Sequence, residues 1–538
     1  MMDMEYLKKH KLLILIIIFT LIRFFLSYHL PNFYYENLGF DDGLMIKEFE
    51  SLISGNYLGT YNNIILTKGI IYPLFLTIIH YIHLNYNVVF TIIYILSCAF
   101  FTKSFKNIIN NKKILLILYI ILLFNPISYS SELFQRLYRN SLSIIEMLLF
   151  LSLVIRIISN KKTKISLYLF LGIISSIMLL TREDNIWIYI VFITLFIYNI
   201  YHNHKVKNII INLVPLLVLI INLNIFSFIN YKNYGVYTYN ELTNSSFKDA
   251  YIKIMQIKDD KKIDKVSISK DVLNKLIDVS EKFNIEKDNL DKMYDRLGDD
   301  NGEINNGNII WYLRNTIYVK NQFLEAKDAN KFFKELKEEI DTLFKEGKLE
   351  KEFVIPSVLI NTPTINEIKE LPKNFLKAII YTSSYQNVRS FSKTDLLKLN
   401  NGSFDDDVNS YIIKCTDYHN TENIIKDNNF IYEVIRIIYK YLTIILSIYA
   451  LFIYIKKIKE KNKINFIISL ILIIYIVILC GITYTDTTAF KAIRYFYLGN
   501  IYILQSVFIF LNIWREYGKG FNNINALFKR GKNNQKMY

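Results

Sequence analysis

Apolar residues along this chain are concentrated in long blocks, and they are not spread at the spacing of a soluble helix or strand. The first block, 12–28, is almost uninterrupted Leu, Ile and Phe, and similar blocks follow it. These cover 69–84, 86–102, 114–128, 141–158, 165–180, 186–201, 208–229, 434–455, 464–481 and 492–512. Blocks of this kind are typical of transmembrane helices. The pattern therefore predicts an all-α, polytopic membrane protein.

The composition agrees with this class. The chain has 538 residues, of which 52% are hydrophobic, and a net charge of +16. Its mean hydropathy is only +0.22 because a polar stretch, about 230–429, dilutes the apolar blocks. Only Cys415 of the three cysteines lies in that stretch, so it contains no internal disulfide. The positive charge follows from the topology, so it gives no reason to predict nucleic-acid binding.

The distribution of Lys and Arg predicts which blocks cross the membrane. If every block crossed, basic loops would fall on both sides, contrary to the positive-inside rule. The block 69–84 is short, contains Pro73 and ends near His80 and His83, which suits a helix lying along the interface. Without it, the basic loops and both termini share one side. We therefore expect about ten spans in the plasma (cytoplasmic) membrane, with both termini cytoplasmic.

This topology divides the chain into three parts. Residues 1–229 form an N-terminal membrane module of seven spans, with a first outer loop at 29–85. Residues 230–433 form an extracytoplasmic domain, which we expect to be mostly helical because Ser269 and Asp328 each precede an amphipathic stripe. Asp328 is expected to cap its helix. Residues 434–538 form a C-terminal membrane module of three spans, followed by a basic cytoplasmic tail.

Charged residues that this topology places on the outer side are candidates for function, because charges at a membrane boundary are costly unless paired or used. The first outer loop contains the adjacent acids Asp41 and Asp42. Adjacent carboxylates repel, so one holds a proton more tightly, and such a pair can supply a general base for an acceptor hydroxyl. The alternative is that one of them caps a helix at 44–53.

Arginines occur in two further outer loops. Arg136 and Arg139 are three residues apart, so a helix would place both guanidinium groups on one face. They could bind a phosphate in the bidentate manner of Arg, or simply anchor to lipid headgroups. Arg494 begins the last span, where it either binds an anion or extends toward the interface.

A third loop places Arg182, Glu183 and Asp184 between two apolar blocks, with almost no connecting length. Arg182 either pairs with one of these acids or faces an anionic ligand, and we favour the ligand. No P-loop, HExxH, GxSxG or GxGxxG motif occurs, which argues against an ATP-driven pump, a zinc protease and the common serine hydrolases. The sequence indicates no certain cofactor; a divalent metal is not excluded, but nothing indicates one.

The order and sidedness of these motifs resemble the GT-C superfamily of integral-membrane glycosyltransferases. Members have an acidic pair in the first outer loop, then a juxtamembrane helix that begins with a Lys-Pro-Pro-like or Lys-Gly-Pro-like sequence. The matching segments here are Asp41-Asp42, Lys68-Gly69, Pro126 to Arg139, Thr181-Arg182 and Arg494-Tyr495. The resemblance is greatest to a bacterial group of unassigned substrate. It covers roughly the first 230 residues and, more loosely, the last spans, whereas the domain at 230–433 is inserted where many relatives have none.

The resemblance implies a GT-C-like bundle that transfers a hexose or pentose, with inversion, from a polyprenyl-phosphate carrier to an unidentified extracytoplasmic acceptor. Asp41 is then expected to act as general base, with Asp42 orienting it or the acceptor. The residues expected to bind the substrate or its phosphate are Lys68, Arg136, Arg139, Arg182, Glu183, Asp184 and Arg494. The expected partners are the lipid-linked sugar donor, membrane lipid and the acceptor.

Three alternatives remain at this stage. One is a flippase or transporter of lipid-linked glycans, although transporters usually place their charges near the membrane midplane and not at one face. Another is an envelope polysaccharide polymerase or ligase, which differs in whether the donor carries one sugar or an oligosaccharide. The last is a membrane-anchored binding protein whose activity resides in 230–433.

Overall fold

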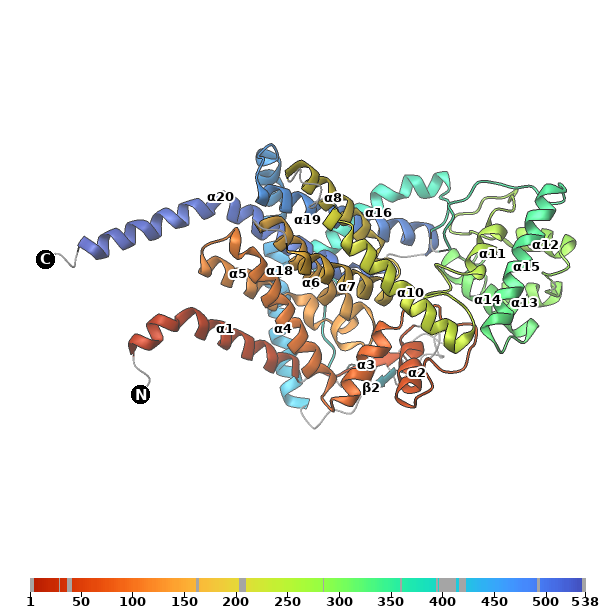
Figure 1. Ribbon diagram of the computed structural model, residues 1–538, viewed down its shortest axis with the longest axis horizontal. Coiled ribbons are helices and arrows are strands. Elements are labelled where there is room, and N and C mark those ends of the chain that lie inside the picture. The colour runs from red at the N-terminus through yellow and green to blue at the C-terminus, as the bar shows by residue number, and fades with distance from the viewer. Residues whose placement is uncertain are drawn as a thin grey trace.

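The computed structural model describes residues 4–28, 30–35, 41–160, 164–202, 210–283, 285–358, 360–392, 395, 413–415, 422–490 and 494–534. These residues form a long helical bundle with a smaller helical domain at one end (Figure 1). Seven of the described helices are long and apolar enough to cross a membrane. They are α1 (Met4–Tyr28), α4 (Tyr86–Ser104), α6 (Asn140–Ser159), α10 (Val214–Tyr234), α18 (Glu422–Lys457), α19 (Lys463–Ala489) and α20 (Gly499–Asn534). The chain is thus helical and has the character of a membrane protein.

Four shorter helices complete the apolar set: α3 (Ile71–Tyr81), α5 (Lys112–Leu123), α7 (Ile165–Thr181) and α8 (Ile188–His202). At a rise of 1.5 Å per residue, α3 is about 16 Å long, half of the roughly 30 Å hydrocarbon core. This length suits a helix that lies along the interface, as expected for 69–84, and that placement stays a prediction. A short 3₁₀ turn, η4 (Asn185–Trp187), leads directly into α8.

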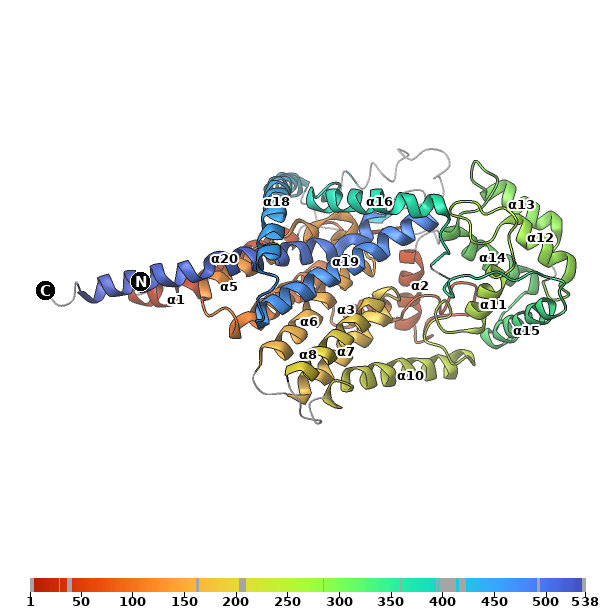
Figure 2. The same cartoon turned by 90° about the horizontal axis from the view of Figure 1, so that it is seen from above.

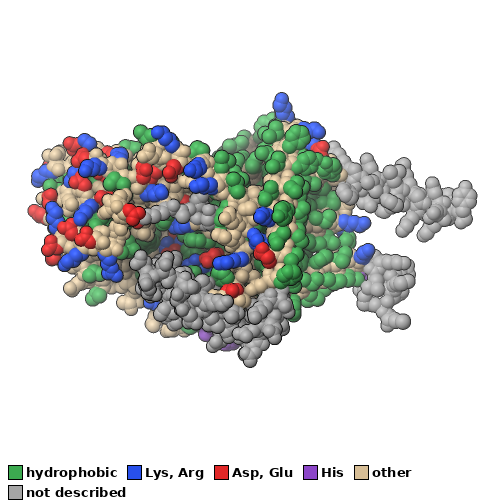
Figure 3. Space-filling model, turned by 180° about the vertical axis from the view of Figure 1, so that it is seen from behind, with side chains coloured by type: hydrophobic (Ala, Val, Ile, Leu, Met, Phe, Trp, Pro, Cys, Tyr) green, Lys and Arg blue, Asp and Glu red, His purple; other side chains and the backbone are tan. Residues whose placement is uncertain are grey.

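Helix α6 lies inside the bundle, whereas α1, α10 and α18 lie at its surface. Leu148, Phe150 and Val154 of α6 are completely buried. By contrast, Leu21 of α1 and Ile448 of α18 are 61% and 72% exposed. Figure 3 shows the resulting belt of hydrophobic side chains over the bundle and the mixed charges over the other part of the molecule. An apolar belt of this kind suits contact with lipid.

The smaller domain contains α11 (Ser246–Met255), α12 (Lys270–Val279), α13 (Lys287–Leu297), α14 (Asn306–Asn321) and α15 (Ala326–Lys345). These helices enclose a second core that includes Leu336 and Ile340. The Ser269 side chain caps α12 by accepting a hydrogen bond from the Val272 amide at 3.2 Å, as expected. The expectation for Asp328 was wrong: Glu325 occupies the N-cap of α15, and Asp328 lies in its first turn.

The segment that follows the smaller domain returns to the bundle. Helix α16 (Ile365–Ser383) contacts α18, α19 and α20, and it extends along the bundle in Figure 2. Ala378 and Tyr385 belong to the bundle core, whereas Val358 is the last residue of the other core. Residues 230–433, expected as one outer domain, thus contain a helix that packs on the membrane part.

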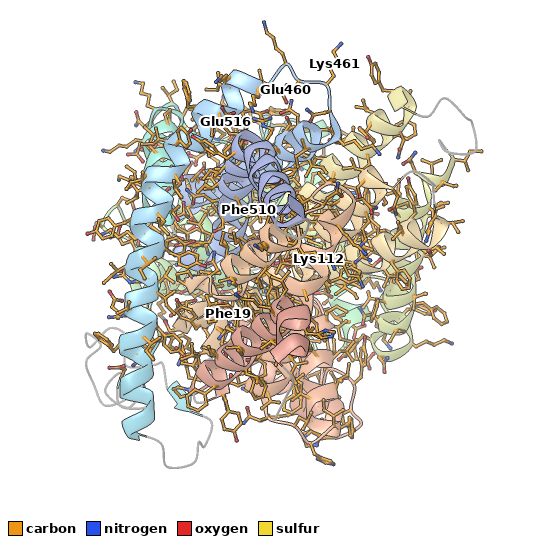
Figure 4. All side chains as sticks on the ribbon, turned by 90° about the vertical axis from the view of Figure 1, so that its left-hand side faces the viewer. Phe19, Lys112, Glu460, Lys461, Phe510 and Glu516 are labelled. Carbon is orange, nitrogen blue, oxygen red and sulfur yellow. The ribbon has the colours of Figure 1, made fainter. Side chains whose placement is uncertain are left out.

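Two short strands, β1 (Phe33–Tyr35) and β2 (Ile413–Cys415), form an antiparallel pair that the sequence did not predict. Both described chain ends lie at the end of the bundle opposite the smaller domain (Figure 1). Figure 4 views that end, where Lys112 of α5 and Lys461 of the α18–α19 connection are labelled. The basic connections therefore lie far from the smaller domain.

Candidate functional site

The predicted site residues lie where the bundle meets the smaller domain, near α2 (Asp41–Ile53) and α3 in Figure 1. They come from the first turn of α2, the segment before α3, the segment before α6, the end of α7, and the residue before η6 (Tyr495–Leu498). Ion pairs or shared aromatic rings link these five segments. The structure thus brings together charges that are hundreds of residues apart in the sequence.

Of the two predicted acids, Asp41 forms ion pairs with more cations. Its Oδ2 atom lies 3.1 Å from Lys68 Nζ and 3.2 Å from Arg139 Nη2, and it accepts a 3.0 Å hydrogen bond from the Tyr138 hydroxyl. Burial raises the pKa of Asp41, but the charges of Lys68 and Arg139 outweigh it, so the net pKa is lowered. The side chain remains 25% exposed, so a ligand can reach it.

Asp42 has different partners from Asp41 and is completely buried. Its carboxylate accepts hydrogen bonds from Nε and Nη2 of Arg136 at 3.0 and 3.1 Å, and from the Tyr35 amide at 2.8 Å. Arg136 also pairs with Glu132 at 3.0 Å. Asp41 and Asp42 therefore both form ion pairs with residues outside α2, so capping of α2 does not account for either of them. A buried bidentate pair such as Asp42–Arg136 fixes local geometry.

Glu183 provides a second acid next to Asp41. Its carboxylate binds Arg139 through two hydrogen bonds of 2.6 and 3.3 Å and lies 3.6 Å from Lys68 Nζ. Burial opposes ionisation, but Arg139 and Lys68 together hold the pKa of Glu183 well below its ordinary value. Asp41 and Glu183 thus share the same two cations, and Glu183, only 8% exposed, is the more deeply placed acid.

Lys68 reaches this cluster because Gly69 permits an unusually close contact. A Cβ atom at Gly69 would lie 1.7 Å from the Leu180 carbonyl oxygen, at the end of α7. Only glycine therefore lets the chain touch α7 here, three residues before Glu183. On its other side the Lys68 ammonium lies 4.9 Å from the centroid of the Trp311 ring of α14. The smaller domain thereby contributes an aromatic wall to the cluster.

Arg136 and Arg139 are not on a helix, contrary to the sequence-based expectation. A short π-helical turn, η3 (Ser131–Gln135), ends just before them, and α6 begins just after. The Leu137 amide instead donates a 2.8 Å hydrogen bond to the Phe33 carbonyl of β1. The backbone is extended at Arg136 but helical at Arg139, and the two arginines reach different acids, Asp42 and Asp41.

Arg182 and Arg494 form a neighbouring part of the cluster. Arg182 pairs with Asp184, with one contact of 2.8 Å, and also donates to Asn140. Arg494 binds Asp486 of α19 through its amide and its Nε, at 2.8 and 3.0 Å. Both guanidinium groups lie 4.7 Å from the centroid of the Tyr497 ring. The ring therefore joins the end of α7 to the end of α19.

Each of the five predicted cations already has a carboxylate partner. The partners differ in exposure: Asp42, Asp486 and Glu183 are 0%, 1% and 8% exposed, whereas Asp41, Glu132 and Asp184 are 25%, 36% and 48% exposed. An anionic ligand can displace an exposed carboxylate at lower cost than a buried one, because the displaced acid is then solvated. Arg182, paired with Asp184, is the cation most available to a ligand.

Sequence reasoning missed Glu48, which lies seven residues after Asp41 and on the same face of α2. The side chain is completely buried, and neither carboxylate oxygen has a hydrogen-bond partner among the described residues. Burial, only partly offset by the Arg139 charge, raises the pKa of Glu48 to about 8. Its position among Leu44, Met45 and Phe49 was the available signal, because an acid on an apolar stripe is unusual.

Tyr138, Tyr497 and Asp486 were also missed, since aromatic and acidic residues in outer loops carry no distinctive pattern. Within the described part of the chain, no group of three or more His, Cys, Asp or Glu side chains is arranged to hold a metal. Comparisons of the chain with protein-family models, with curated proteins and with solved structures find no match. The resemblance to the GT-C superfamily therefore stays a prediction from sequence motifs.

Proposed function

We propose that this protein is a GT-C-type glycosyltransferase of the plasma membrane. It would move a sugar from a polyprenyl-phosphate carrier to an acceptor on the extracytoplasmic face. The observation that carries the proposal is the position of Asp41, a partly exposed carboxylate held between Lys68 and Arg139 at the end of an apolar helical bundle. A base next to phosphate-binding cations, at the edge of a lipid-facing bundle, is what transfer from a lipid carrier requires.

The proposal includes ten spans with both termini in the cytoplasm. Two supports come from helix lengths: α7, with 17 residues, and Asn185–Tyr201 of η4 and α8, also with 17, reach the lower limit for crossing. With the seven long helices they make nine spans, and the tenth would be α5 continued by η2 (Pro126–Tyr129), 18 residues from Lys112 to Tyr129. A third support comes from charge, because Lys112 and Lys461 are labelled on the bundle end that Figure 4 views, whereas α2 and α3 lie near the smaller domain in Figure 1. The cluster and the smaller domain would then face outward.

In the proposed reaction, an acceptor hydroxyl attacks the anomeric carbon of the donor from the face opposite the phosphate. The new carbon–oxygen bond forms as the bond to the phosphate oxygen breaks, and the phosphate leaves with the bonding electrons. Asp41 takes the acceptor proton and later releases it to solvent. The products are the glycosylated acceptor, with inverted anomeric configuration, and polyprenyl phosphate.

Donor binding would switch Asp41 from a weak base to a stronger one. In this structure Lys68 and Arg139 stabilise the Asp41 carboxylate and lower its pKa. A donor phosphate that attracts these cations would draw their charge away from Asp41, so its pKa would rise toward the ordinary value. Arg182, whose partner Asp184 is exposed, would turn to the departing phosphate. The buried Asp42–Arg136 pair would hold the first turn of α2 in place.

The test is sugar transfer by the purified full-length chain in liposomes, using a panel of radiolabelled polyprenyl-phosphate sugars and cell-envelope extract from a deletion strain as acceptor. Asp41→Asn should lower turnover by about 10²–10⁴-fold, the usual contribution of a general base. Asp328→Asn, on the outer domain far from the cluster, is the matched control and should transfer normally. Full activity of Asp41→Asn, or movement of donor across the bilayer without transfer, would refute the proposal.

A further inference from the structure

A cavity of about 520 Å³ lies outside the cluster described above, between the chain that follows α16 and one flank of α18. The side chains that matter in its wall are Gln386, Asn387, Arg389, Glu433, Arg436 and Lys440. None of them belongs to the predicted site. In Figure 2, α18 is seen nearly end-on and α16 runs away from it along the bundle, and Figure 4 shows α18 at the margin of the bundle. A volume of this size suits a small ligand or a headgroup.

The cavity wall carries an excess of positive charge. Among the described residues that line the cavity, Arg389, Arg436 and Lys440 face one acid, Glu433, so the formal balance of these four groups is positive. Arg436 Nη1 donates a 3.1 Å hydrogen bond to the Tyr385 carbonyl, and its Nε binds Glu433 at 2.8 Å. This arrangement fixes the guanidinium group in the wall. A freely moving arginine at a membrane edge would not have such a carbonyl anchor.

Glu433, the acid in the cavity wall, is the more exposed partner of its ion pair with Arg436 and can move away from it. The side chain of Glu433 is 45% exposed, whereas that of Arg436 is 21% exposed. Turning Glu433 toward solvent would therefore leave the anchored guanidinium free to accept a new anion. Arg389, which lies 5.1 Å from the Phe391 ring centroid, would approach the same anion from the other wall. Two guanidinium groups from different segments suit a phosphate, which accepts bidentate hydrogen bonds.

The surroundings of the cavity indicate a lipid and not a soluble anion. Arg436 and Lys440 are one turn apart on α18, and beside them Ile437, Ile438 and Tyr441 are 41%, 50% and 59% exposed. Below these residues the exposed apolar face continues through Ile445 and Ile448, at 64% and 72%. An anion seated between Arg389 and Arg436 would thus lie at the head of an apolar track that suits acyl chains.

We propose that this cavity binds the phosphate headgroup of an anionic membrane lipid, whose chains lie along the exposed face of α18. The proposal does not depend on the glycosyltransferase activity. The cavity wall contacts the turn behind the candidate active site, since the Arg389 carbonyl accepts a 2.7 Å hydrogen bond from the Ser131 amide of η3. Bound lipid would therefore lie next to the segment that leads to Arg136.

The experiment is native mass spectrometry of the full-length chain in detergent, titrated with dioctanoyl phosphatidylglycerol, with dioctanoyl phosphatidylcholine and with inorganic phosphate. The wild type should retain phosphatidylglycerol preferentially. Arg389→Gln should weaken this binding on the order of tenfold, because one charge-assisted hydrogen bond is lost. Arg389 is exposed, so this variant should fold normally; Arg436→Gln should weaken binding at least as much. Arg296→Gln, in the smaller domain, is the matched control and should bind normally.

Three results would overturn the proposal. Equal retention of phosphatidylcholine and phosphatidylglycerol would show that the anion is not recognised. Phosphatidylglycerol binding that survives in both Arg389→Gln and Arg436→Gln would place the lipid elsewhere. Binding of inorganic phosphate as tightly as phosphatidylglycerol would show that the ligand is a soluble anion.

Discussion

The cluster around Asp41 and the surface of the smaller domain are both rich in ion pairs, but the two regions use them differently. In the cluster, Lys68, Arg136 and Arg139 are 4–7% exposed, and they share acids from several segments. On the domain, pairs such as Lys253–Asp341 are 19% and 35% exposed and isolated. Exposed pairs contribute little to stability, whereas a buried pair fixes geometry and is costly to break. The difference indicates that the ion pairs of the cluster serve to hold its charged side chains in fixed positions.

The largest expected effect comes from removing one partner of a buried ion pair and leaving the other in place. Arg136→Gln would leave Asp42, which is completely buried, without its charged partner. We expect the unfolding free energy to fall by about 3–5 kcal/mol, since an uncompensated charge remains inside the protein. Denaturant titration in detergent micelles would measure it. A loss below about 1 kcal/mol would mean that the cluster behaves like the surface pairs.

A second test uses Glu48, the buried acid without a hydrogen-bond partner. Its folded pKa of about 8 lies above the ordinary 4.5, so the folded protein holds a proton that the unfolded chain loses as pH rises between these values. Glu48 therefore destabilises the fold increasingly through this range, and fully above about pH 8. Each unit of pKa shift corresponds to about 1.4 kcal/mol, so the penalty amounts to a few kcal/mol.

Glu48→Gln removes this penalty, and it should stabilise the protein by a few kcal/mol at pH 9. At pH 4 both side chains are neutral, so the variant and the wild type should unfold alike. The measurement is the same titration at the two pH values, with Glu338→Gln on the exposed face of α15 as control. An equal effect of Glu48→Gln at both pH values would exclude titration of Glu48 as the cause.

Much of the architecture follows from one-dimensional patterns, but the pairing inside the cluster does not. Hydrophobic blocks are local, so they predicted apolar helices such as α4 and α6, and loop charge placed Asp41 and Arg182 on one face. Which cation pairs with which acid depends on contacts such as Asp42–Arg136, 94 residues apart. The extended backbone at Arg136 and the hydrogen bond from Leu137 to Phe33 depend on a distant contact, which no local pattern reveals. Burial of Glu48 requires the packed structure in the same way.

A third test concerns how Lys68 is brought to the cluster. Gly69→Ala would place a methyl group within 1.7 Å of the Leu180 carbonyl oxygen, so the segment must move away from α7. Overpacking of this kind costs about 1–3 kcal/mol. The matched control is Gly481→Ala in α19, where an added Cβ atom meets nothing within 4 Å. That control should be neutral or slightly stabilising, because Ala favours helix.

Gly69→Ala should also impair sugar transfer, because Lys68 would shift relative to Asp41 and Glu183. If transfer and stability both match the wild type, the close contact with α7 is not what positions Lys68. A loss of transfer in Gly481→Ala as well would instead indicate general damage to the bundle, and the comparison with Gly69 would lose its meaning.

The smallest expected effect comes from the surface of the smaller domain. Lys253→Gln breaks the 2.5 Å pair with Asp341, but both side chains reach solvent, so water replaces the lost partner. The unfolding free energy should change by less than about 1 kcal/mol, and the change should shrink further at high salt. Measured under the same conditions as Arg136→Gln, this variant gives the change in unfolding free energy that an exposed ion pair produces. A loss comparable to that of Arg136→Gln would show that exposure does not separate the two regions.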